Sequence, residues 1–205
     1  MAGPAARRGL PAPVPSTLPP ATATCMFLFV LLYLALVIVR PQEYPALVDW
    51  GVPVLQIALG GAFLLWILDG RKDFGAPQFP LLFAFLFVLM FSLAVNGWMG
   101  GTLDQLSRFG PIVAAFVLVA NSVTTHRRAR ILMATLVLCT LVPAVHGIDQ
   151  KAKGIGWTGV GLIQEDGRIQ YLGIFNDPND LGMLFVIALP MALLLSRGGG
   201  MMGLR

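Results

Sequence analysis

The sequence predicts an all-α protein that crosses a membrane about six times. Three observations favour this class: six apolar stretches without Lys, Arg, Asp or Glu, a charged fraction of only 12%, and basic loops that alternate along the chain. Soluble domains contain roughly 25% charged residues. A segment in lipid must satisfy its own backbone polar groups, so each stretch is predicted to be helical. The expected spans are residues 21–39, 52–68, 79–95, 109–123, 131–148 and 181–195.

The lengths of these stretches suit a bilayer. Seventeen helical residues rise about 26 Å, close to a hydrocarbon core of ~30 Å. The two shortest stretches, 109–123 and 181–195, need flanking residues or a locally thinner bilayer. Six prolines among residues 1–20 predict a disordered, Pro/Ala-rich tail ahead of the first span. A cleavable signal peptide is the alternative, but the apolar run is long for one and ends at Arg40-Pro41 instead of small residues.

The distribution of basic residues predicts the orientation. Nine of the 14 Lys and Arg residues lie before the first span or after the second, fourth and sixth spans, and five lie in the other loops. Cytoplasmic loops carry an excess of Lys and Arg, so both termini are expected in the cytoplasm. Because the positive charges are spread over loops and form no single face, nucleic acid is not an expected partner.

The spans hold little chemistry of their own. Transporters and proton relays place ionisable groups inside the membrane, whereas here only His146 lies within a span, near the outer end of the fifth. We expect it to cap or pack that helix end. The first three spans do not repeat in the last three, which disfavours an inverted-repeat transporter. Cys25 and Cys139 lie in separate spans and have no metal-ligand spacing, so neither a metal nor a disulfide is expected.

The longest loop, residues 149–180, carries the most specific pattern. It is expected on the outer side, it begins Gly-rich around Trp157, and it ends in Gly173-Ile174-Phe175-Asn176-Asp177-Pro178-Asn179-Asp180. Loops of this length in compact bundles are usually functional or disordered. The end of the loop is also a good helix start, with Asp177 as N-cap, Pro178 as the first helical residue and Asp180 in the first turn.

The pattern R-x-x-x-x-G-x-F-N-D-P-N-D-L-G, which begins at Arg168 and precedes an apolar helix, resembles the O-antigen ligase and polymerase family. In that family a similar stretch opens a transmembrane helix on the periplasmic side. The residues that carry the resemblance are Gly173, Phe175, Asn176, Asp177, Pro178, Asn179 and Asp180. The segment from Arg40 to Pro45 is similar to the exosortase-associated O-glycosylation ligases. The resemblance implies a GT-C-like fold, of which this chain is the N-terminal half.

The resemblance also implies an activity: transfer of a polyprenyl-diphosphate-linked glycan to an acceptor at the periplasmic face of the bacterial inner membrane. Membrane lipid and that glycan are the implied partners, and no metal or cofactor is expected. Arg168 is the first candidate to contact the diphosphate, followed by Arg108 and Arg40. A planar guanidinium holds phosphate oxygens in a bidentate manner and stays charged. The alternative for Arg168 is an interfacial anchor.

The chain departs from the family at its end. Family members continue through further spans to a large periplasmic loop with the expected catalytic histidine, so no catalytic residue is assigned here. Residues 198–205 are interpreted as a cytoplasmic loop cut before the next helix. Whether this chain is an enzyme is left open. We expect it to be inactive alone and to need a C-terminal half or a partner subunit. A non-enzymatic membrane scaffold and a small transporter remain the alternatives.

Overall fold

The computed structural model describes residues 20–70, 72–163 and 167–197, which form helices joined by loops. The predicted tail of residues 1–20 falls outside this range except for its last residue, as does the predicted tail 198–205. The α-helices are α1 Pro20–Val39, α2 Val54–Leu68, α3 Gln78–Val95, α4 Met99–Ser122, α5 His126–Lys153 and α6 Pro178–Ser196. Three short 3₁₀ turns accompany them: η1 Pro41–Glu43, η2 Val48–Trp50 and η3 Gly173–Phe175.

The all-α class is confirmed, and the helices have the character of membrane spans. Five of them, α1, α3, α4, α5 and α6, are long and apolar enough to cross a membrane. The remaining one, α2, is apolar but has only 15 residues and spans about 22 Å. The protein is therefore described as a helical membrane protein, while the number of six spans stays a prediction.

Two helices extend at least five residues beyond the apolar stretches that predicted them. Helix α4 begins at Met99 instead of residue 109. Its first ten residues include polar ones such as Thr102 and Asp104, yet they belong to the helix that pairs with α3. Helix α5 extends to Lys153, into the predicted loop 149–180. An ion pair between Asp149 and Lys153, 2.6 Å apart, supports its last turn. Gly154 then ends the helix in a left-handed conformation with φ of 84°.

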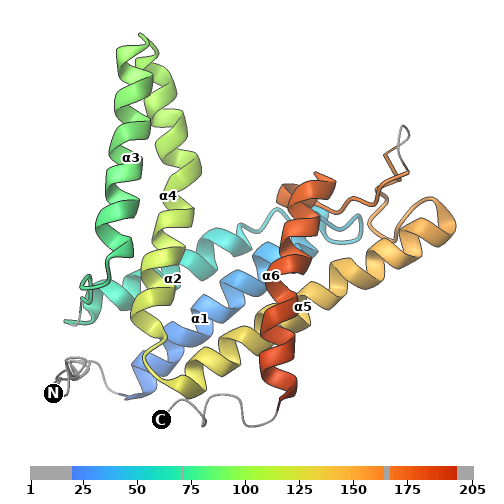
Figure 1. The fold of residues 1–205 in the computed structure, drawn as a ribbon, viewed down its shortest axis with the longest axis horizontal. Helices are drawn as coiled ribbons and strands as arrows, with labels where there is room; N and C mark the ends of the chain where they lie inside the picture. Colours follow the sequence, from blue (N-terminus) through green and yellow to red (C-terminus); the bar gives the residue numbers. More distant parts are fainter. Residues whose placement is uncertain (1–19, 71, 164–166, 198–205) are drawn as a thin grey trace, which may run out of the picture.

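The helices form two groups. Helix α1 packs against both α2 and α5, and α6 crosses α5, whereas α3 and α4 make a hairpin that rises away from them (Figure 1). Only the last turns of α4 reach the first group, where Val117 and Leu118 are buried. The upper half of the hairpin stands well apart from α6 in Figure 1.

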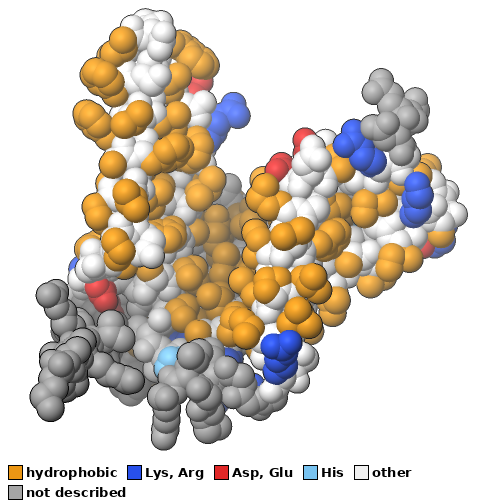
Figure 2. Space-filling model, in the orientation of Figure 1, with side chains coloured by type: hydrophobic (Ala, Val, Ile, Leu, Met, Phe, Trp, Pro, Cys, Tyr) orange, Lys and Arg blue, Asp and Glu red, His pale blue; other side chains and the backbone are white. Residues whose placement is uncertain are grey.

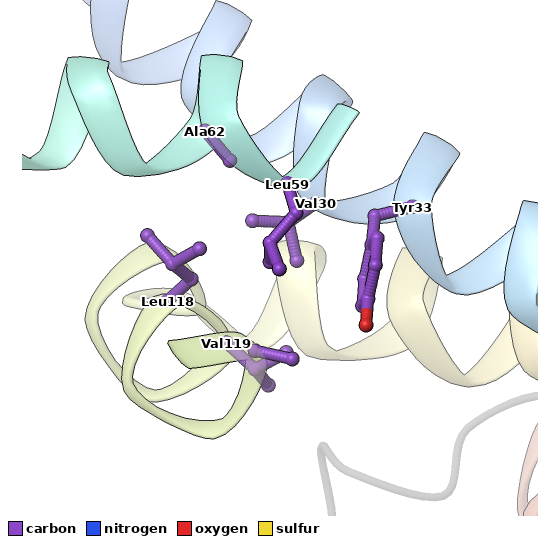
Figure 3. Close-up of a pocket in the computed structure, with 7 residues that line it drawn as sticks. Val30, Tyr33, Leu59, Ala62, Leu118 and Val119 are labelled. Carbon is purple, nitrogen blue, oxygen red and sulfur yellow. The ribbon is translucent and has the colours of Figure 1, made fainter. Parts of the chain in front are cut away.

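One hydrophobic cluster of the core lies where α1, α2 and α4 meet, beside a small pocket. Val30 from α1, Ala62 from α2 and Leu118 from α4 are all buried there and contact one another (Figure 3). The small side chain of Ala62 lets α1 and α2 approach closely, and Leu59 and Val119 fill the sides of the same junction. This junction joins the α3–α4 hairpin to the rest of the molecule.

Much of the outer surface is apolar. Figure 2 shows hydrophobic side chains along the lengths of α3, α4, α5 and α6, with Lys and Arg gathered toward the ends. Individual side chains on this surface are highly exposed, among them Leu81, Phe87, Val186 and Leu189. Soluble monomers rarely expose apolar patches of this extent. A surrounding bilayer accounts for them, because lipid tails are as apolar as these side chains.

One end of the bundle is held by a guanidinium group. Arg128, in the first turn of α5, donates to the carbonyl of Ser122 at 2.9 Å and to that of Ala23 at 3.2 Å, and it lies over the ring of Phe27. It therefore ties the start of α1 and the end of α4 to α5. We call this the arginine end. Every loop at this end is one that the basic residues predicted to be cytoplasmic.

The α2–α3 connection is fixed at the same end. Asn121 of α4 accepts a hydrogen bond from the backbone N–H of Asp73 at 2.8 Å and donates to Val117 at 2.9 Å. Lys72 donates to the carbonyl of Trp66 at 2.6 Å and lies over its indole ring. The terminal carbonyls of α2 thus receive a cation, which the helix dipole favours.

Replacing Arg128 with Ala should destabilise the folded protein, because two backbone carbonyls lose a charged donor. We expect a loss of about 1.5–3 kcal/mol in the free energy of unfolding. The matched control is Arg127→Ala, since Arg127 is exposed and equally charged; we expect a change within about 0.5 kcal/mol. Thermal unfolding of both variants in detergent, followed by circular dichroism, measures the difference. Equal melting temperatures would contradict the role of Arg128.

Candidate functional site

The candidate site lies at the opposite end of the bundle, where α1 and α5 end and α6 begins. Residues 154–163 and 167–177 form loop segments there, and we call this region the loop end. Tyr171 is its centre and is fully buried. Its hydroxyl donates to the carbonyl of Val39, the last residue of α1, at 2.6 Å, and lies 2.7 Å from the hydroxyl of Tyr44. Because the single proton of Tyr171 is used by Val39, Tyr44 is the donor in the pair of tyrosines.

The environment of Tyr171 keeps its hydroxyl protonated. Burial is the largest cause that raises the pKa of Tyr171 well above its usual value near 10, and the Glu43 carboxylate adds to it. A phenol with a raised pKa carries no charge at neutral pH. Tyr171 therefore acts here as a hydrogen-bond donor and is not a phenolate nucleophile.

Arg40 sits beside this pair in an unusual backbone conformation. Its φ of 51° is left-handed, a region where residues other than Gly are uncommon. Its backbone N–H closes α1 by donating to Leu36 at 3.1 Å. The side chain is only 14% exposed, is ion-paired with Glu43, and lies against Gly173, where an added Cβ would overlap the guanidinium. The structure thus brings together Arg40 and Gly173, two residues that the sequence singled out separately.

His146 is a second fully buried residue of the loop end, and it packs against Tyr171. Its Nε2 lies 2.8 Å from the hydroxyl of Thr158, and its ring contacts those of Trp157 and Tyr171 with centroids 4.9 and 5.0 Å away. Gly156 passes so close that a Cβ there would overlap the imidazole. Within the part of the chain that the structure describes, Nδ1 of His146 has no hydrogen-bond partner. The prediction that His146 packs the end of α5 agrees with this position.

Gln150, one helical turn after His146, orders the loop. Its side-chain N–H groups donate to the carbonyls of Val160 and Gly161 at 3.0 and 2.9 Å, and its carbonyl accepts from the backbone N–H of Gln170 at 3.0 Å. Gln170 in turn donates to Gly161 at 2.8 Å. One buried amide therefore joins two segments of the loop, Val160–Gly161 and Gln170.

The predicted helix start at the end of the loop is confirmed. Asp177 is the N-cap of α6, and its carboxylate accepts from the backbone N–H of Asn179 at 2.7 Å. Pro178 opens the helix and Asp180 lies in its first turn. Phe175 is buried with Tyr171 and Leu181. The polar side chains of Asn176, Asn179 and Asp180 are exposed, so a ligand can reach them.

The three candidate arginines occupy different settings. Arg168 is exposed in the loop, and its backbone carbonyl accepts from Ile163 at 3.1 Å. Arg108 is exposed on the upper half of α4, next to Phe109, whose ring packs on Phe85 of α3. The structure therefore places Arg40 and Arg168 at the loop end, and it holds Arg108 on the separate hairpin. Their role as diphosphate contacts stays a prediction.

The sequence singled out neither Gln150 nor Tyr171 as central to this end. One signal was present, because His146 and Gln150 are polar residues one turn apart at the end of the apolar stretch 131–148. Polar groups in such helices face protein interior more often than lipid. Among the described residues, no group of three or more His, Cys, Asp or Glu side chains is arranged to hold a metal ion.

Comparison with known proteins identified no relative of this chain. No protein-family model, no curated protein and no solved structure matches this chain. A function must therefore be argued from the residues of the loop end.

Replacing Tyr171 with Phe should destabilise the loop end, because the Val39 carbonyl loses its hydrogen-bond donor and the Tyr44 hydroxyl loses its acceptor. We expect a loss of about 1–3 kcal/mol in the free energy of unfolding, measured by thermal melting in detergent at pH 7. Tyr44→Phe is the comparison, since it leaves the Tyr171–Val39 bond in place and should cost less. A Tyr171→Phe variant as stable as the unmodified protein would contradict this account.

The raised pKa of Tyr171 predicts that the stability of the folded protein falls as the pH rises above 10, which the same melting experiment can measure. The stabilising effect of the neutral phenol is complete below the unfolded pKa near 10 and is lost as the pH rises above it, because the unfolded chain then releases a proton that the folded chain keeps. The melting temperature of the unmodified protein should thus fall more steeply above pH 10 than that of Tyr171→Phe. Identical slopes would contradict this assignment.

Proposed function

We propose that this protein acts in the transfer of a polyprenyl-diphosphate-linked glycan to an acceptor, in the manner of O-antigen ligases and polymerases. In this proposal the loop end faces the periplasm of a bacterium, the chain lies in the inner membrane with both termini in the cytoplasm, and the helices have a GT-C-like arrangement. The helical, apolar character of the chain agrees with the proposal, since the lipid-linked donor is a membrane substrate.

The observation that carries the proposal is the exposure of Arg168 at the same end as the segment from Gly173 to Asp180. A lipid diphosphate leaving group develops negative charge as the glycan departs. A cation held close to it lowers the barrier, because it stabilises that charge in the transition state. Arginine suits this task, since its fork binds two phosphate oxygens and it cannot lose its charge.

The surroundings of Arg168 support this role. The backbone on both sides of Arg168 is held by hydrogen bonds. Lys151 donates to the carbonyl of Gly167 just before it, and Gln170, two residues after it, donates its backbone N–H to Gln150. The exposed side chains of Asn176, Asn179 and Asp180 offer hydrogen bonds suited to sugar hydroxyls at the start of α6. Arg40 is already ion-paired with Glu43 and lies against Gly173. We therefore assign Arg40 the role of positioning Gly173 and prefer Arg168 as the diphosphate contact.

Arg168→Gln should reduce glycan transfer by roughly 10- to 100-fold, because one charged phosphate donor is removed. Arg168→Lys should keep part of the activity, since the charge remains and the bidentate fork is lost. The control is Lys153→Gln, which removes an exposed cation from the same end of the molecule. Each variant replaces the chromosomal copy, membrane levels are matched by immunoblotting, and the glycan on the acceptor is quantified. Full transfer by Arg168→Gln at normal protein level would contradict the proposal.

A further inference from the structure

A shallow groove runs along the seam between α5 and α6 close to the loop end. It encloses about 380 Å³. Its walls are apolar except at one position, and they are formed by Ala144, Gly147, Ile148, Lys151, Ile169 and Phe185. None of these residues was given a role in the proposed glycan transfer, although Ile169 follows Arg168 directly in the chain.

The groove ends where the loop folds over it. Gly147 has no side chain, and the tip of Ile169 fills the space above it, since an added Cβ would lie 2.7 Å from Cδ1 of Ile169. On the other side the groove opens onto the outer surface of α5, where Ile148 is 72% exposed. Both α5 and α6 are long and apolar enough to cross a membrane. Hydrocarbon chains of the bilayer are therefore the natural contents of the groove.

Lys151 gives the groove a charge at its loop end. It lies in the last turn of α5, and its ammonium group donates to the carbonyl of Gly167 at 2.8 Å. An ammonium has three N–H donors, so this bond leaves two for a ligand. The carboxylate of Asp149 is paired with Lys153 at 2.6 Å. Among residues 20–70, 72–163 and 167–197, no ion pair engages Lys151.

We propose that this groove is a binding site for a glycerophospholipid with a singly charged anionic headgroup, of the phosphatidylglycerol type. One acyl chain lies along Ala144, Ile148 and Phe185, and the phosphate receives hydrogen bonds from Lys151. One ammonium matches one negative charge. A diphosphate-linked lipid carries more charge than Lys151 alone complements, so a bilayer lipid fits better than the donor of the proposed reaction.

A lipid bound in this way has a structural consequence. Lys151 already links α5 to the loop through Gly167, and the acyl chain would bridge α5 to α6. A ligand that binds the folded state alone stabilises it in proportion to the logarithm of its concentration. The anionic lipid should therefore hold the loop and the α5–α6 seam together. This inference does not depend on the glycan-transfer proposal.

The test compares two lipids with identical acyl chains, phosphatidylglycerol and phosphatidylethanolamine, added to the purified full chain in neutral detergent. Native mass spectrometry counts retained lipid, and thermal melting measures stabilisation. The unmodified protein should retain the anionic lipid about fivefold better, as expected for one lysine near a membrane surface. Lys151→Gln should lose this preference, Lys151→Arg should keep it, and Ala144→Phe should weaken retention of both lipids by filling the groove.

The matched control is Lys153→Gln, which removes a neighbouring cation that does not line the groove and should leave the preference unchanged. Thermal melting without added lipid identifies any variant that fails to fold. If Lys151→Gln fails to fold, the lipid retention of Lys151→Arg and Ala144→Phe still tests the proposal. The proposal is overturned if the unmodified protein shows no preference, or if Lys151→Gln and Lys153→Gln behave alike. It is also overturned if undecaprenyl phosphate displaces phosphatidylglycerol at equal concentration, because the groove would then belong to a polyprenyl lipid.

Discussion

The carbonyl of Val39 needs a hydrogen-bond donor once α1 has ended, and the hydroxyl of Tyr171 supplies it from the other end of the sequence. Helix termini leave carbonyl groups without partners, and an apolar environment makes such groups costly. The backbone at Arg40 turns left-handed to end α1 at this point. Because Tyr171 must reach Val39, the end of α1 determines where the long loop lies. The contacts of Arg40 with Gly173 and of Tyr44 with Tyr171 lie beside this bond.

The two ends of the bundle are held by different chemistry. At the arginine end a guanidinium of α5 joins α1 and α4 by charged hydrogen bonds. At the loop end the joining groups are mainly neutral, namely the Tyr171 hydroxyl and the Gln150 amide. This arrangement leaves the charged side chains Arg168 and Lys151 accessible at the loop end. Exposed cations suit the binding of anionic groups, and both proposals made for this end rest on that feature.

The local pattern of the sequence was sufficient for much of the fold. Apolar stretches located α1, α2, α3 and α6 to within three residues, and the run Asp177-Pro178 predicted the start of α6 correctly. The first turns of α4 were missed because they contain polar residues and so do not belong to an apolar stretch, although they pair with α3 in the structure. The bond from Tyr171 to Val39 joins residues far apart in the chain, and no local pattern encodes such a pairing. For the same reason the sequence grouped Arg108 with Arg40, although the structure places it on the separate hairpin.

The central claim is that the arginine end and the loop end lie on opposite sides of a membrane. The most direct measurement is the labelling of single cysteines in a chain whose Cys25 and Cys139 have been changed to Ala. Arg127→Cys marks the arginine end and Ile155→Cys marks the loop end, and both positions are exposed. A membrane-impermeant maleimide is added to intact cells whose outer envelope has been made permeable. Under these conditions the cysteine of Ile155→Cys should be labelled at once. Arg127→Cys should react only after the inner membrane is opened. Labelling of both positions from the same side would contradict the account.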